Sequence, residues 1–134
     1  MAIESTDQDR FILVVAKLLE LTQQKKLRWS TDPATSDPLG TPEAEREVRN
    51  AYMAHYEGRR LRIYEKLVPI NSLRRLATGQ RETLKVWRPV LELSESSGQG
   101  WWPFPKLDSI ADLMRAVQYQ VSGVDDFVER VLKR

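Results

Sequence analysis

The sequence contains no cysteine among its 134 residues, and this absence excludes several kinds of chemistry. Without thiols the chain cannot form disulfide bonds, use a thiolate nucleophile or build the cysteine-ligated zinc sites common in small domains. A chain that needs no disulfide is typical of a reducing compartment, so we expect a cytoplasmic protein. We also expect no metal ion and no cofactor.

Long apolar runs are missing as well. The longest spans residues 11–16, far below the roughly 20 residues that cross a bilayer. It follows the acidic residues Glu4, Asp7 and Asp9 instead of the basic segment that begins a signal peptide. The sequence therefore predicts neither a membrane span nor a secretion signal.

Residues for catalysis and phosphate binding are scarce. His55 is the single histidine, and no motif ties it and the nearby Glu57 to a nucleophile. The six glycines are scattered and form no phosphate-binding loop. The acidic groups at Asp108 and Asp125 follow no calcium-loop spacing, and acidic residues at helix starts are expected as caps. We therefore predict that the chain is not an enzyme.

Positive charge is concentrated in the middle of the chain, although the formal net charge is only +2. Nine basic residues and two acidic residues fall between Gly58 and Val90. Such a stretch is typical of a surface that binds phosphates, but alternating arginines on a strand also keep an antiparallel sheet soluble. Both interpretations stay open at this point.

A chain of this length buries one core, so we predict a single domain over residues 1–134. Residues 5–8 match a capping box, and apolar residues at helical spacing follow as far as Leu21. This apolar face is wider than contact with a sheet requires, so a second surface, such as another subunit, is expected to pack against it. Residues 30–45 are rich in turn-forming residues and predict a flexible loop.

From Val48 the apolar period changes to two, which predicts a β-hairpin around Glu57 and Gly58. A third strand is predicted over residues 83–93, where Pro89 implies a bulge or an edge position. After a turn, Trp101 and Trp102 can form a short fourth strand. Residues 67–80 are ambiguous, because their apolar spacing suits a short helical turn that Pro69 and Gly79 would limit.

Two helical patterns end the chain, one behind a cap at Asp108 or Ser109 and one over residues 124–132. Gly123 lies between them and suits the left-handed position at a helix end. The predicted order is thus an N-terminal helix, an antiparallel meander of three or four strands and two C-terminal helices, which is an α+β fold. We expect the helices to cover one sheet face and the other face to stay open.

Four segments carry a resemblance. They are the Lys-Leu-Arg-Trp step at 26–29, the hairpin at 56–64, the aromatic and proline segment at 101–105, and Tyr-Gln-Val-Ser-Gly-Val-Asp-Asp-Phe at 119–127. Together they resemble a family of small uncharacterised bacterial proteins, many of them cyanobacterial, that end in a similar motif. This family has no established activity, so the resemblance implies a bacterial, cytoplasmic, single-domain protein and transfers no catalytic residue.

Two groups of side chains are candidate contact residues. Arg60, Arg62 and Tyr64 alternate along one strand face, a pattern that suits nucleic acid and also suits an acidic protein partner. Trp101 and Trp102 form either an exposed aromatic platform or the seal at the bottom of the core. The candidate partner-binding residues are therefore Arg60, Arg62, Tyr64, Trp101 and Trp102.

The leading hypothesis is a non-enzymatic protein-interaction or self-associating module, whose partner is another protein or a second copy in a homodimer. The alternative is a nucleic-acid-binding accessory protein. It would use the basic residues of the hairpin region, namely Arg59, Arg60, Arg62, Arg74, Arg75 and Lys85. An enzyme with scattered catalytic residues is a third alternative, and no membrane partner is expected.

Overall fold

The computed structural model describes residues 5–32, 47–75 and 81–134. The elements are α1 (Ser5–Gln23), β1 (Trp29–Thr31), β2 (Val48–Tyr56), β3 (Arg59–Arg75), β4 (Arg81–Ser94), β5 (Trp101–Pro103), α4 (Ser109–Ser122) and α5 (Val124–Leu132). This order confirms the predicted α+β fold. The sheet has five strands in the order β1-β2-β3-β4-β5, one more than the upper estimate from the sequence.

The additional strand is β1, whose last two residues, Ser30 and Thr31, fall in the segment expected to be a loop. Trp29 pairs with Ala54 and Thr31 pairs with Tyr52, so β1 forms one edge of the sheet. Three residues are too few to show an alternating pattern, and the buried indole of Trp29 is what anchors them. Most of the expected loop, residues 33–45, lies outside the described residues.

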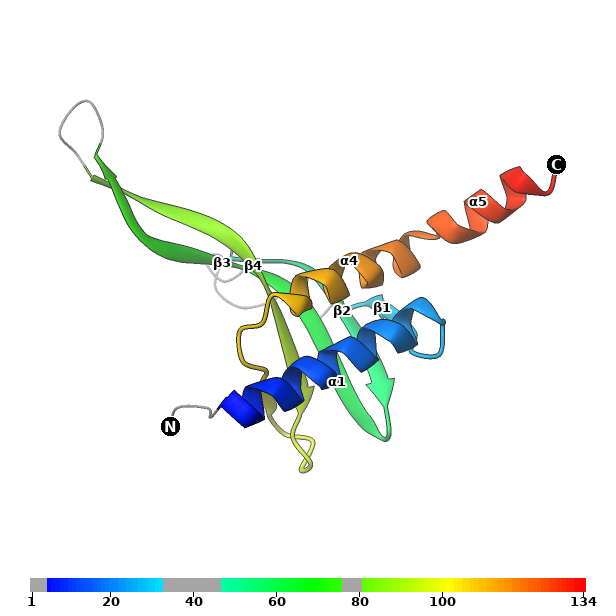
Figure 1. Ribbon diagram of the computed structural model, residues 1–134, viewed down its shortest axis with the longest axis horizontal. Helices are drawn as coiled ribbons and strands as arrows, with labels where there is room; N and C mark the ends of the chain where they lie inside the picture. The colour runs from blue at the N-terminus through cyan, green and yellow to red at the C-terminus, as the bar shows by residue number, and fades with distance from the viewer. Residues whose placement is uncertain (1–4, 33–46, 76–80) are drawn as a thin grey trace.

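The strands β3 and β4 form a long hairpin that projects from the body of the molecule (Figure 1). Over residues 67–75 the ambiguous segment is part of β3, so the helical turn considered there is wrong, and residues 76–80 lie outside the described part of the chain. The register shifts between Pro69 and Leu73, which is how a strand accommodates a proline without a backbone N–H. At Pro89 the register is continuous, and because β5 pairs only with residues 92–94, this position is at an edge, as predicted.

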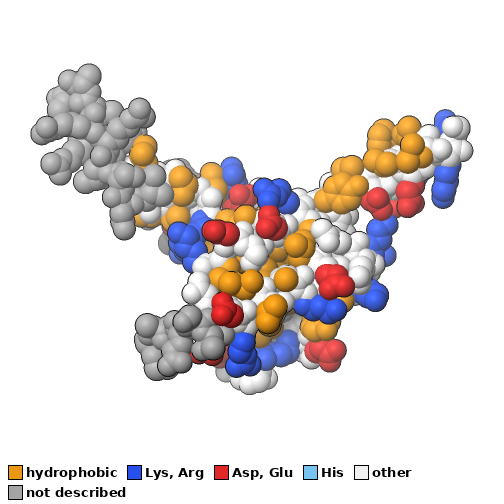
Figure 2. All heavy atoms as spheres, in the orientation of Figure 1, with side chains coloured by type: hydrophobic (Ala, Val, Ile, Leu, Met, Phe, Trp, Pro, Cys, Tyr) orange, Lys and Arg blue, Asp and Glu red, His pale blue; other side chains and the backbone are white. Residues whose placement is uncertain are grey.

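The start of α4 and the junction between α4 and α5 can be compared with the sequence predictions. Asp108 occupies the N-cap position of α4, but its side chain makes no capping hydrogen bond. Gly123 has φ 76°, which confirms the predicted left-handed residue between α4 and α5. From this residue α5 extends away from the body, with hydrophobic side chains visible along it (Figure 2). Among the described residues, no helix combines the length and the apolar character needed to cross a membrane.

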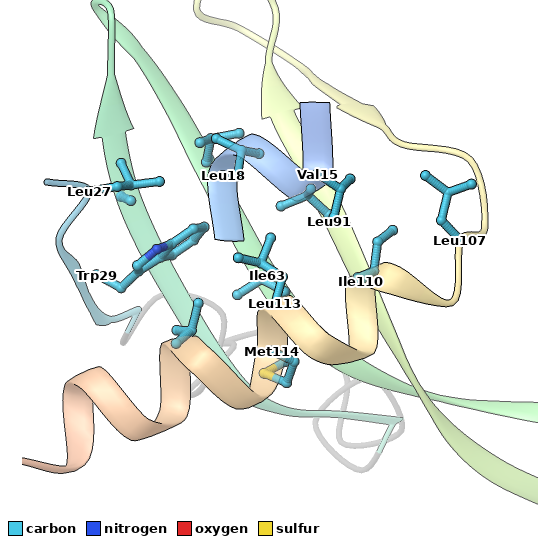
Figure 3. Close-up of a cluster of buried hydrophobic side chains, with 13 residues drawn as sticks. Val15, Leu18, Leu27, Trp29, Ile63, Leu91, Leu107, Ile110, Leu113 and Met114 are labelled. Atoms are coloured by element: carbon cyan, nitrogen blue, oxygen red, sulfur yellow. The ribbon is translucent and has the colours of Figure 1, made fainter. Parts of the chain in front are cut away.

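The core lies between one face of the sheet and the two helices α1 and α4, which run side by side across it (Figures 1 and 3). Val15 from α1, Ile63 from β3, Leu91 from β4 and Leu113 from α4 are fully buried and meet at its centre. Burying each such side chain stabilises the fold by about 1.5–3 kcal/mol. These contacts determine which sheet face the helices cover.

The side-chain amide of Gln120 connects α4 to α1 and β1. Its oxygen accepts a hydrogen bond from the backbone N–H of Trp29 at 2.7 Å. Its Nε2 donates to the carbonyl oxygens of Thr22 and Leu27 at 3.0 and 2.9 Å. The indole N–H of Trp29 also donates to the buried hydroxyl of Thr22 at 3.0 Å. The end of α1, the start of β1 and the end of α4 are therefore joined by one network.

We predict that Gln120→Ala lowers the free energy of unfolding by about 3 kcal/mol, because three hydrogen bonds worth about 1 kcal/mol each are lost. Urea denaturation of the purified protein measures this difference. Gln118→Ala is the matched control, since Gln118 lies on the same helix and takes part in none of these bonds. Equal losses in the two variants would show that the network does not hold the fold.

Candidate functional site

The sheet face opposite the helices carries the predicted contact residues of β3. Side chains alternate along a strand, and Leu61 and Ile63 point into the core. Arg60, Arg62 and Tyr64 therefore lie on the other face, which no helix covers within the described part of the chain. We call this surface the open face.

Trp101 joins this face from the neighbouring part of the sheet. Trp101 pairs with Ser94 of β4, which brings the indole ring beneath two guanidinium groups. The distance from the guanidinium carbon to the centroid of the ring is 4.1 Å for Arg62 and 5.0 Å for Arg60. Arg62 also lies 5.7 Å from the ring of Tyr64. These geometries are cation–π contacts, and they bring four of the five predicted residues together.

Glu92 also belongs to this group of side chains on the open face. It is not among the candidate residues predicted from the sequence. It pairs with Arg62 across β3 and β4, and the guanidinium Nε of Arg62 donates a hydrogen bond to its carboxylate. The two side chains are only 24% and 12% exposed, so water screens this ion pair less than a surface pair. We define the arginine–tryptophan cluster as Arg60, Arg62, Tyr64, Glu92 and Trp101.

Backbone contacts hold the cluster at the β3–β4 junction. The N–H of Arg60 donates to the hydroxyl of Ser94 at 2.9 Å, and the guanidinium of Arg59 donates to the carbonyl oxygen of Ser94 at 2.6 Å. Ser94 is buried, so these bonds are shielded from water. Together with the ring contacts, they restrict the side chains of the cluster before any partner binds.

Trp102 is separated from the cluster, because its neighbour in sequence points to the opposite face. Its ring stacks on Phe11 of α1, with centroids 5.3 Å apart, and meets Phe104 edge-on at 5.7 Å. The side chain remains 41% exposed. The two interpretations of the aromatic segment therefore each describe one tryptophan: Trp101 belongs to the open face, and Trp102 packs at the margin of the core.

Positive charge continues along the open face toward the projecting hairpin. Lys66 of β3 pairs directly with Arg88 of β4, and like charges at opposed positions are unfavourable in an antiparallel sheet. Arg74 and Arg75, which belong to the nucleic-acid hypothesis, have side chains outside the described part of the molecule. The open face is thus basic at its outer end and contains a neutralised ion pair at the cluster.

The residues considered for acid-base or metal chemistry do not assemble into a site. His55 is exposed, and Asp125 forms an ion pair with Lys25 at 2.7 Å. Asp112 forms an ion pair with Arg115 one helical turn away. Over residues 5–32, 47–75 and 81–134, no three histidine or carboxylate groups cluster in a way that could hold a metal ion.

Comparison with known proteins does not assign the chain to a family. The chain matches no family model, and no match was found among the curated proteins or the solved structures. The candidate site therefore depends on its own geometry.

We predict that Trp101→Ala and Trp102→Ala have different effects on stability. Trp102→Ala removes the stacking on Phe11 at the core and should lower the free energy of unfolding by about 2–3 kcal/mol. Trp101→Ala loses contacts with two partly solvated guanidinium groups and should cost about 1 kcal/mol. Urea denaturation compares them. A larger loss for Trp101 would place that residue, and not Trp102, in the packing of the fold.

We also predict that Tyr64 ionises above the ordinary tyrosine range. Burial and the negative charge of Glu92 raise the pKa of Tyr64 above 10.0, although Arg62 opposes them. The folded pKa exceeds the unfolded one, so this contribution to stability is complete below pH 10 and is lost as pH rises through the folded pKa. Phenolate absorbance of the wild type minus that of Tyr64→Phe measures the midpoint. A midpoint at or below 10 would contradict the prediction.

Proposed function

We propose that this protein is a non-enzymatic protein-interaction module that binds an acidic segment of a partner protein through the open face. The observation that carries the proposal is the arginine–tryptophan cluster. Arginine, tryptophan and tyrosine are the residues most enriched at the energetic centres of protein interfaces. A guanidinium stacked on a ring keeps its N–H groups free at the edge, where they match the geometry of a carboxylate.

Preorganisation supports the same proposal. Binding costs less side-chain entropy when the contact residues are already ordered. Arg62 is held by Glu92 and by two aromatic rings, and the backbone of Arg60 is held by Ser94. Arg60 has no carboxylate partner in the cluster, so the cluster has an uncompensated positive charge that an acidic partner would neutralise.

The cellular setting belongs to the proposal as well. The absence of cysteine is compatible with a reducing cytoplasm, and the resemblance of the four segments favours a bacterial protein. We therefore propose that the partner is a bacterial cytoplasmic protein.

A pull-down from bacterial lysate tests the proposal. We expect a partner that is retained by the wild type and lost by the double variant Arg60→Gln and Arg62→Gln. The matched control, Arg10→Gln with Lys26→Gln, removes the same amount of charge from α1 and the turn after it and should retain the partner. Because Arg62→Gln leaves Glu92 without its cation, Arg60→Gln alone serves as the second variant. Equal retention by all variants would refute the proposal.

Nucleic-acid binding is the second candidate function, favoured by the opposed pair Lys66 and Arg88 on the same face as Arg60. Against it, Glu92 neutralises Arg62, and guanidinium groups already cover the ring of Trp101 that would stack on a base. Titration of labelled single-stranded and duplex DNA and RNA separates the two functions. Affinity that persists at physiological salt and falls steeply as salt rises would favour nucleic acid, whereas its absence would favour a protein partner.

A further inference from the structure

The helix α5 has an apolar face that stays exposed in the part of the chain that the structure describes. All of α5 lies within the described residues, and no residue of it is buried. Phe127 and Leu132 are 67% and 78% exposed. The apolar face consists of Val124, Phe127, Val128, Val131 and Leu132, and side chains at these spacings share one side of a helix. A continuous exposed apolar face of this kind marks an interaction surface.

A groove of about 640 Å³ lies next to the start of α5, between α1 and α4. Its apolar lining includes Leu19 of α1 and Ala116 and Tyr119 of α4. On α1 the exposed residues Ile12 and Ala16 precede Leu19 at helical spacing and extend this apolar surface along the helix. A groove between two helices with an apolar lining is suited to receive an apolar helix face.

The connection between α4 and α5 is short for a helix that would fold back into the groove of its own chain. Only Gly123 separates the two helices, whereas helices that pack side by side are usually joined by 2–8 residues. One contact between α5 and the body is the ion pair of Lys25 and Asp125, which lies in the first turn of α5. A short connection beside an unfilled groove is the arrangement that favours exchange of an element between two copies.

The area of these surfaces points to a reciprocal exchange. The apolar face of α5 exposes on the order of 500 Å² of side chain, below the roughly 800 Å² per partner of a stable interface. If each copy docks its α5 in the groove of the other, each copy contributes one α5 face and one groove. The buried area is then about twice that of a single docked helix. Positive and negative side chains line the groove in equal number, so apolar contact and not charge holds the docked helix.

We propose that α5 of each chain docks in the groove between α1 and α4 of a second copy, forming a two-fold exchanged dimer. This inference concerns a different surface from the open face, so either proposal can fail without the other. It assigns a partner to the wide apolar face of α1, for which the sequence predicts a second packing surface. It also accounts for the exposed apolar residues of α5.

Single cysteines in this cysteine-free chain test the docking directly. Light scattering should give about twice the chain mass of 15.6 kDa. In an equimolar mixture of Ala116→Cys and Val128→Cys, mild oxidation should link one variant to the other. Glu129→Cys, on the polar side of α5, should link poorly to Ala116→Cys. A monomeric mass would overturn the proposal.

Two other cross-linking results would also overturn it and would identify what covers α5 instead. Preferential linking of Val128→Cys to itself would mean that two α5 helices pair with each other. A chain that carries both Ala116→Cys and Val128→Cys, stays monomeric and forms an intrachain disulfide would mean that α5 folds back on its own groove. Self-linking gives a dimer with Val128→Cys alone, whereas the intrachain disulfide leaves the mass of a single chain.

A pair of substitutions on α5 separates docking from folding. Phe127→Gln should weaken dimerisation about tenfold or more, because a buried aromatic side chain is lost in both halves. Arg130→Gln, on the polar side of the same helix, should leave the dimer unchanged. Arg60→Gln should also dimerise normally, which distinguishes failure of this proposal from failure at the open face. Equal dissociation constants for the wild type and Phe127→Gln would refute the docking.

Discussion

The amide of Gln120 is the constraint on which the arrangement of this molecule depends. A single side chain accepts from Trp29 and donates to the carbonyl oxygens of Thr22 and Leu27, so α4 cannot shift relative to the end of α1 or to β1 without breaking partly buried hydrogen bonds. Hydrophobic packing of α1 and α4 on the sheet is not directional. The amide supplies the direction, because its donors and acceptor fit one relative position of the three segments.

The two surfaces proposed for binding follow from this placement. With α1 and α4 held together on one side of the sheet, the opposite side keeps Arg60, Arg62 and Trp101 accessible. The same bonds fix the end of α4, and the left-handed Gly123 then directs α5 away from the body. The open face and the projecting helix are therefore consequences of one packing arrangement.

Much of this fold could be predicted from periodicity, and the exceptions have physical reasons. The hairpin turn at Gly58 and the helix end at Gly123 were predictable, because both positions have positive φ, which favours glycine. The strand β1 was not, since three residues carry no period. The extension of β3 past Pro69 was missed because the register shift that accommodates the proline depends on pairing with a distant strand.

For the candidate site, too, one part could be predicted from the sequence and another part could not. That Arg60, Arg62 and Tyr64 share a face follows from alternation alone, and so does the separation of Trp101 from Trp102, since neighbouring residues in a strand point to opposite faces.

Glu92 could not be assigned to Arg62 without the register of β3 and β4, which the length of the intervening hairpin decides. That ion pair changes the character of the surface. A bare row of arginines would attract any polyanion through long-range charge, which salt screens over about 10 Å. A guanidinium held between a carboxylate and two rings presents directional N–H donors at a fixed position, and recognition by short directional contacts favours a shaped protein partner over a uniform phosphate backbone.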